Sequence, residues 1–265
     1  MSRLLSLLAG LVLVACSSDD NRTTGKRIVL HGSITGDPTV RSTLTTGFGW
    51  DVTLTKAAIT TNGFYYFDGP PPTAMHERPK KSAGERFASL FLGTAWAHPG
   101  HYEAGTALGQ VVLAAPLTID LFGAAPIPLP DGEGITGTYR SARFVIPQNG
   151  PGDALLGTHV ALAEGKAVKH DGSTTTPIFF RLVADYADVS ASIQNGAVDG
   201  CVLDETNVTD SGSITLAITA KVWLNLVDFE KIAPGAEAAP TEAKDPGFSQ
   251  GVTQLSAYRF KYTQP

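Results

Sequence analysis

Two of the six histidines in this 265-residue chain lie on either side of a Pro-Gly pair, as His98-Pro99-Gly100-His101. Proline presets φ at the second position of a β-turn, and glycine accepts the positive φ of the third, so the pair predicts a type II turn. Such a turn brings the Cα atoms of its first and fourth residues to within about 7 Å. Both imidazoles can then reach a single metal ion.

A carboxylate follows the turn at a useful spacing. Glu103 lies two residues after His101, so an extended backbone there places both side chains on one face. Two imidazoles and a carboxylate form a half-site suited to zinc or copper(II). A further ligand must come from elsewhere, and the first candidate is His31, which lies opposite the apolar side chains of residues 28–34. The alternative is a solvated turn that binds no metal.

Other potential ligands are better explained without a metal. Among the remaining histidines, His159 and His170 are expected to be solvated, and His76 is expected to lie in a disordered proline-rich loop. Cys201 is expected to be buried as a small hydrophobic residue. A cluster of five acidic residues could suggest a calcium site, but its spacing does not match that of an EF-hand loop. We therefore expect these carboxylates to be solvated: Asp185, Asp188, Asp199, Asp204 and Glu205.

The sequence favours a binding protein over an enzyme. It contains no Gly-x-Ser-x-Gly elbow, no His-Glu-x-x-His pair and no Walker loop. The net charge is −5, and the lysines and arginines are scattered, which argues against nucleic acid as a partner. The alternative to metal binding is a metal-free structural or interaction module, and a hydrolase is a more distant third.

The first sixteen residues predict export. An apolar run over residues 4–14 follows Arg3 and ends in the tetrad Leu-Val-Ala-Cys, whose last residue is Cys16. A run this short, after a basic residue and before small ones, is typical of a secretory signal and not of a membrane span. The tetrad resembles the lipobox of bacterial lipoproteins, and the resemblance covers residues 1–16 only.

This resemblance implies cleavage before Cys16 and acylation of that cysteine, which anchors the protein to a membrane. Ser17 stands where an inner-membrane retention signal usually has Asp, which favours the outer membrane, with the domain facing the periplasm or the exterior. An ordinary signal peptide with an incidental cysteine is the alternative. The resulting organisation is a signal peptide (1–15), a lipidated cysteine and polar tether (16–26) and a single domain (27–265).

The domain that carries these candidate ligands is predicted to consist of β-strands. Apolar and polar residues alternate in runs such as Ser213–Trp223 and 255–262, which is the pattern of half-buried strands. Asn62-Gly63 and Asp171-Gly172 predict hairpin turns between strands. We therefore predict an all-β fold, an antiparallel β-sandwich with a β-barrel as the alternative. The three tryptophans, Trp50, Trp96 and Trp223, are expected to fill its core.

Two long proline-rich stretches interrupt the alternation. They cover residues 69–84 and 233–247. Proline has no N–H for a sheet ladder, so both stretches are expected to be loops.

Overall fold

The computed structural model describes residues 25–70, 105–123, 126–173, 176–193 and 196–265. Strands dominate these ranges, which confirms the all-β prediction. The strands are β1 (Arg27–Gly36), β2 (Leu44–Thr45), β3 (Trp50–Phe67), β4 (Ala107–Asp120), β5 (Ile127–Pro128), β6 (Gly132–Ile135), β7 (Gly137–Val145), β8 (Ala161–Lys169), β9 (Ile178–Ala184), β10 (Ala197–Val208), β11 (Gly212–Ile218), β12 (Thr241–Ala243) and β13 (Tyr258–Thr263). The short helices are α2 (Tyr186–Ser190), α3 (Ala220–Leu224) and α4 (Pro246–Val252), with 3-10 turns η1 (Pro38–Arg41), η2 (Phe229–Lys231) and η3 (Leu255–Ala257).

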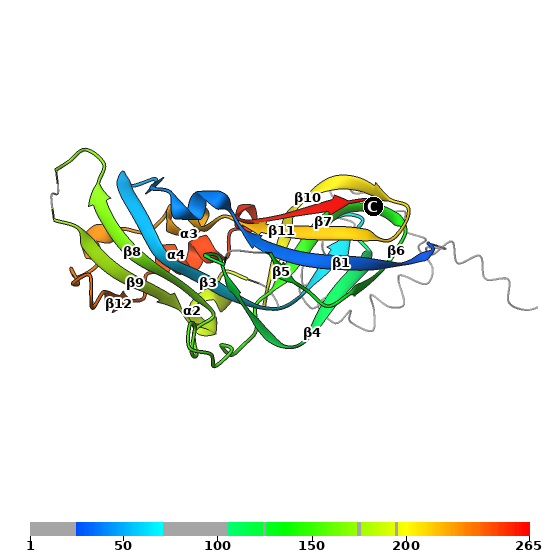
Figure 1. Cartoon of the computed structure of the whole chain (residues 1–265), viewed down its shortest axis with the longest axis horizontal. Coiled ribbons are helices and arrows are strands. Elements are labelled where there is room, and N and C mark those ends of the chain that lie inside the picture. Colours follow the sequence, from blue (N-terminus) through cyan, green and yellow to red (C-terminus); the bar gives the residue numbers. More distant parts are fainter. Residues whose placement is uncertain (1–24, 71–104, 124–125, 174–175, 194–195) are drawn as a thin grey trace, which may run out of the picture.

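The described strands belong to one hydrogen-bonded sheet (Figure 1). Part of it closes into a ring of pairs in the order β3-β4-β6-β1-β11-β13-β10-β7, because β7 also pairs with β3. The first half of β3 pairs with β8, which continues to β9 and β12 as an open sheet. The sheet is mixed and not wholly antiparallel, since β1–β11, β10–β13 and β9–β12 are parallel pairs. Parallel neighbours need long connections, and these three pairs join strands far apart in the chain.

β3 links the ring to the open sheet, and it does so by running through Asn62-Gly63. The predicted hairpin at this pair is wrong, because β3 continues for 18 residues without turning. Gly63 has φ +140° and lies at a register shift against β4. A Cβ at this position would lie 2.3 Å from the carbonyl oxygen of Val111. The glycine therefore serves a β-bulge, the other main use of positive φ in a strand.

The second Gly-containing pair does turn the chain. β8 and β9 are antiparallel neighbours, and Gly172 between them has φ +72°. The hairpin predicted at Asp171-Gly172 is confirmed.

Aromatic side chains fill the interior of the ring. The ring centroid of Phe260 on β13 lies 5.7 Å from that of Phe64 and 5.7 Å from that of Tyr66, both on β3. β3 and β13 are not neighbours in the sheet, so these contacts cross the interior. Tyr139 is fully buried beside them, and its hydroxyl lies within hydrogen-bond distance of two backbone carbonyls, those of Leu108 and Ile135.

A second part of the core lies between the open sheet and the short helices. Trp50 on β3 packs against Phe229 of η2 at 5.6 Å between ring centroids, and Trp223 of α3 packs against Phe248 of α4 at 6.4 Å. Both tryptophans are buried, as predicted. Trp96 lies outside the described residues.

Two predicted elements differ from the observed ones. The strand predicted over Ser213–Trp223 ends at Ile218, and α3 follows, so the apolar pattern continues across a change from strand to helix. The stretch 233–247 is not wholly a loop, because it contains β12 and the first residues of α4. β12 is three residues long, follows Pro240 and lies at the edge of the sheet, where proline is tolerated. Most of the stretch 69–84 lies outside the described residues.

Candidate functional site

The predicted metal turn and the predicted lipidation residue lie outside the described residues: His98, His101, Glu103 and Cys16. The structure describes the residues on either side of the segment that contains this turn, Pro70 before it and Gly105 after it. The N–H of Gly105 donates to the carbonyl of Pro70 at 2.6 Å, so these two residues are adjacent. Gly109 of β4 pairs with Gly134 of β6, which pairs with Ile28 of β1. Both residues therefore lie at the end of the sheet where β1 begins.

His31 is the one predicted ligand that the structure describes. It lies on β1 with its side chain 58% exposed, while Leu30 and Ile34 on the other face of the strand are buried. Its Nδ1 atom lies 2.7 Å from Oδ1 of Asp131, which immediately precedes β6. No described residue forms a hydrogen bond with its Nε2 atom. The contact fixes the ring and leaves Nε2 facing solvent.

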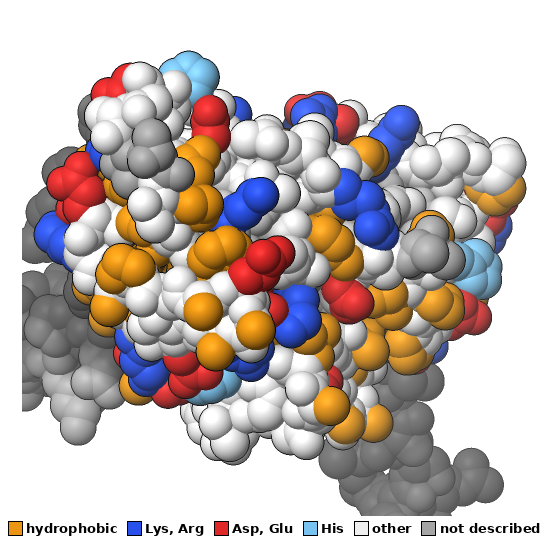
Figure 2. All heavy atoms as spheres, turned by 60° about the vertical axis from the view of Figure 1, so that its left-hand side comes forward, with side chains coloured by type: hydrophobic (Ala, Val, Ile, Leu, Met, Phe, Trp, Pro, Cys, Tyr) orange, Lys and Arg blue, Asp and Glu red, His pale blue; other side chains and the backbone are white. Residues whose placement is uncertain are grey.

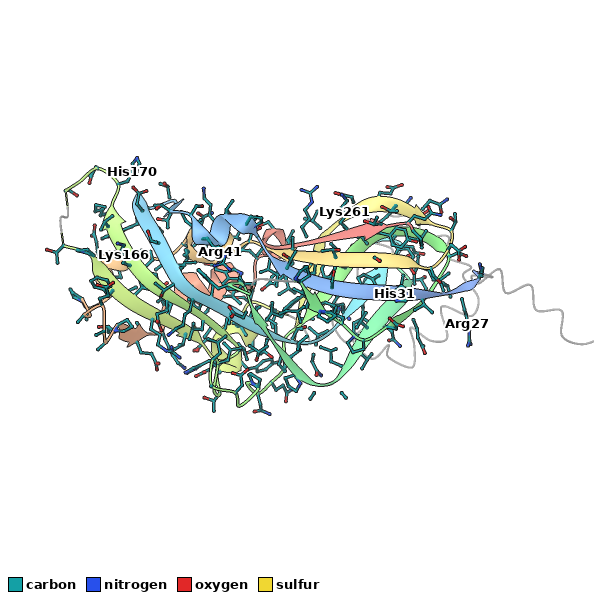
Figure 3. The ribbon with its side chains drawn as sticks, in the orientation of Figure 1. Arg27, His31, Arg41, Lys166, His170 and Lys261 are labelled. Atoms are coloured by element: carbon teal, nitrogen blue, oxygen red, sulfur yellow. The ribbon has the colours of Figure 1, made fainter. Side chains whose placement is uncertain are left out.

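The other two described histidines have the same arrangement. Nδ1 of His159 lies 2.6 Å from Asp185, and Nδ1 of His170 lies 2.8 Å from Asp51. Figure 3 shows His31 and His170 near opposite ends of the molecule. Sequence reasoning missed all three carboxylate partners, since each lies 26 to 119 residues from its histidine in the chain.

The acidic residues considered for calcium do not converge on one site. Each contacts a basic side chain instead: Asp185 and Asp188 contact Lys244, Asp199 contacts Arg143, Asp204 contacts Arg259 and Glu205 contacts Arg140. Hydrogen bonding by Lys244, with a further bond from His159, lowers the pKa of Asp185 despite its partial burial. Within the described ranges, no group of three or more His, Cys, Asp or Glu side chains is placed to hold a metal ion.

Cys201 is a buried thiol, as predicted. It is 1% exposed, and its Sγ atom lies 3.3 Å from the carbonyl oxygen of Val198. Burial raises its pKa to about 12, so the reactive thiolate is not populated near neutral pH.

Two open hollows lie on the described surface. One, of about 360 Å³, lies between α2 and α4 and is lined by residues that include Lys244 and Ser249. The other, of about 390 Å³, lies beside the start of β1 and includes Lys26 and Asn207. In the part of the chain that is described, no hydrogen bond joins a hydroxyl or thiol side chain to a histidine, so no nucleophile–base pair is formed there.

No protein-family model, curated protein or solved structure matches this chain. None of the helices in the described ranges has the length and apolar character needed to cross a bilayer.

Proposed function

We propose that this chain is a lipid-anchored envelope protein that binds copper or zinc for sequestration or delivery. Its ligands are His98 and His101 of the predicted turn, with Glu103 and His31. Acylation at Cys16 holds it on the outer membrane, with the domain facing the periplasm or the exterior. The observation that supports metal binding is the carboxylate contact of His31, because it presents an oriented imidazole on an exposed strand.

The contact with Asp131 is the kind that metal ligands use. A ligating histidine commonly donates its second ring N–H to a carboxylate, which fixes the tautomer and makes the other nitrogen a better donor. Nδ1 of His31 makes such a contact, and Nε2 is left to bind an ion. Imidazole and carboxylate ligands suit zinc and copper(II).

The place of His31 is compatible with this role. It is the fifth residue of β1, and the segment that carries the predicted turn is rooted at the end of the sheet where that strand begins. A polar tether enters the domain at the same end.

The test is a zinc and copper titration of the mature protein and four variants. We expect His98→Ala/His101→Ala to abolish tight binding, His31→Ala to weaken it about tenfold or more, and Asp131→Asn to weaken it about tenfold. The matched control is His170→Ala, because His170 is an exposed histidine with the same carboxylate contact at the other end of the molecule. Uptake by the double variant equal to that of the wild type would remove the turn as a site. Equal effects of His31→Ala and His170→Ala would remove His31.

A metal-free interaction module is the second candidate, and the open sheet supports it. Four charged side chains of alternating sign cross it in register, Lys56 on β3, Glu164 on β8, Arg181 on β9 and Glu242 on β12. Figure 2 shows acidic and basic side chains interspersed with apolar ones on this side of the molecule, which suits a protein partner better than a polyanion. A folded wild type that takes up neither metal would favour this candidate.

A further inference from the structure

The tripeptide Asn207-Val208-Thr209 ends β10 and begins the connection to β11. Asn-x-Thr, with x other than proline, is the acceptor sequence for N-linked sugar in exported proteins. A match of three residues is common by chance, so the structural setting must support it.

The two polar side chains of the motif are exposed on the same side of the chain. Val208 is fully buried, whereas Asn207 and Thr209 are exposed, as alternation along an extended chain requires. The amide of Asn207 forms no hydrogen bond with any described residue. Oγ1 of Thr209 accepts a hydrogen bond from Nε2 of Gln264 at 3.3 Å, which leaves its own O–H free to donate. Attaching a sugar at Asn207 therefore breaks no contact of the fold.

Space for a sugar adjoins the asparagine. The open hollow of about 390 Å³ is lined by Asn207, Val208 and Thr209 on one side and by Lys26, Thr136 and Gly137 on the other. β10 pairs with β7 at this level, through Asn207 and Thr138, but its pairing with β13 is confined to Val202 and Leu203. A sugar on the amide can lie in this hollow, directly over the junction between tether and domain.

We infer that Asn207 is an N-glycosylation site. The donor is an oligosaccharide pyrophosphate carried on a polyprenyl lipid. A bond forms between Nδ2 of Asn207 and C1 of the first sugar, the bond from C1 to the pyrophosphate oxygen breaks, an amide proton passes to a base of the transferase, and the lipid pyrophosphate leaves. The inference rests on the export that the proposed function includes, but not on metal binding.

The experiment is peptide mapping by mass spectrometry of the mature protein purified from its native cells. We expect peptides that contain Asn207 to carry the mass of whole sugar residues, and Asn207→Gln and Thr209→Ala to lose it. Thr209→Ser keeps the hydroxyl and should keep the sugar. The matched control, Asn225→Gln, changes an exposed asparagine that Leu226 and Val227 follow, so it should have no effect.

An Asn207 found only in unmodified form would overturn the inference, as would a sugar that survives Thr209→Ala. A second match, Asn21-Arg22-Thr23, lies in the tether, so the variants are compared in an Asn21→Gln background. The N-terminal peptide in the same spectra reports cleavage and acylation at Cys16. Failure of the anchor is thereby distinguished from failure of the sugar site.

Discussion

Nδ1 of His170 lies 2.8 Å from Oδ2 of Asp51, and this contact joins the end of β8 to the start of β3. The backbone N–H of His170 also donates to the carbonyl of Gly49, so two hydrogen bonds connect the end of β8 to the start of β3. The hydrogen bond that His170 donates to Asp51, aided by the charges of Asp51 and Asp171, raises the pKa of His170. The same bond, with a second from Thr45, lowers the pKa of Asp51.

The raised pKa of His170 and the lowered pKa of Asp51 predict that their contact stabilises the fold most in mildly acidic solution. The contribution of His170 is fully present below its ordinary pKa of 6.5 and is lost as the pH rises through the raised value. The contribution of Asp51 is present above its ordinary pKa of 3.8 and is lost as the pH falls through the lowered value. Between these limits both groups are charged. We expect His170→Ala to lower the melting temperature by up to about 3 °C at pH 5.5 and by much less at pH 8.5.

Thermal melts at the two pH values, with Lys166→Ala as the control, measure this difference. Lys166 is exposed on the same strand and makes no contact with His170 or Asp51. A deficit for His170→Ala that grows from pH 5.5 to pH 8.5 would contradict the assignment.

Gly63 gives a prediction about the backbone. Alanine there would require φ near +140° and would place its Cβ 2.3 Å from the carbonyl oxygen of Val111. We expect Gly63→Ala to cost more than about 3 kcal/mol of unfolding free energy, because strain and a backbone clash act together. Gly49→Ala is the matched control: φ is +71° but nothing lies within 4 Å of the new Cβ, so the expected cost is about 1–2 kcal/mol. Urea unfolding measures both, and equal losses would show that the clash is relieved by movement of β4.

The same glycine shows what the sequence could and could not predict. Alternating apolar residues correctly predicted strands, because burial on one face of a strand has a local signature. The burial of Trp50 and Trp223 was predicted from their large apolar side chains. Asn62-Gly63 was misread because positive φ serves both a hairpin turn and a bulge, and only the partner strand decides between them. The end of β11 at Ile218 was missed for a related reason, since the buried residues continue into α3.

The site was less accessible to sequence reasoning than the fold. The exposed position of His31 follows from alternation along β1, and the burial of Cys201 follows from its residue type. The carboxylate beside His31 does not follow, because Asp131 is brought to it by pairing of β1 with β6, 100 residues away in the chain. Long-range strand pairing carries no local signal, and it decides which polar side chains meet.

The charged row on the open sheet gives the last prediction. Glu164 stands between two cations, with Oε1 2.8 Å from Nζ of Lys56 and Oε2 3.0 Å from Nη1 of Arg181. Its side chain is only 14% exposed. Burial alone would raise its pKa, but the hydrogen bonds from Lys56 and Arg181 outweigh burial and lower it. Arg181 also reaches Glu242, at 3.2 Å, whose side chain is 55% exposed.

We expect Glu164→Gln to cost about 1–3 kcal/mol of unfolding free energy at pH 7, because two cations lose a half-buried charged partner. Glu242→Gln at the exposed end of the row should cost less than about 1 kcal/mol. Since the pKa of Glu164 is lowered, its contribution is present above its ordinary value of 4.5 and is lost as the pH falls through the lowered value. Denaturant unfolding of the wild type and both variants at pH 7 and pH 3 measures this, and the Glu164→Gln deficit should shrink at pH 3. Equal losses of unfolding free energy for the two variants at pH 7 would contradict this prediction. They would mean that burial does not strengthen the contacts of Glu164 with Lys56 and Arg181, and that the row acts as solvated surface charge.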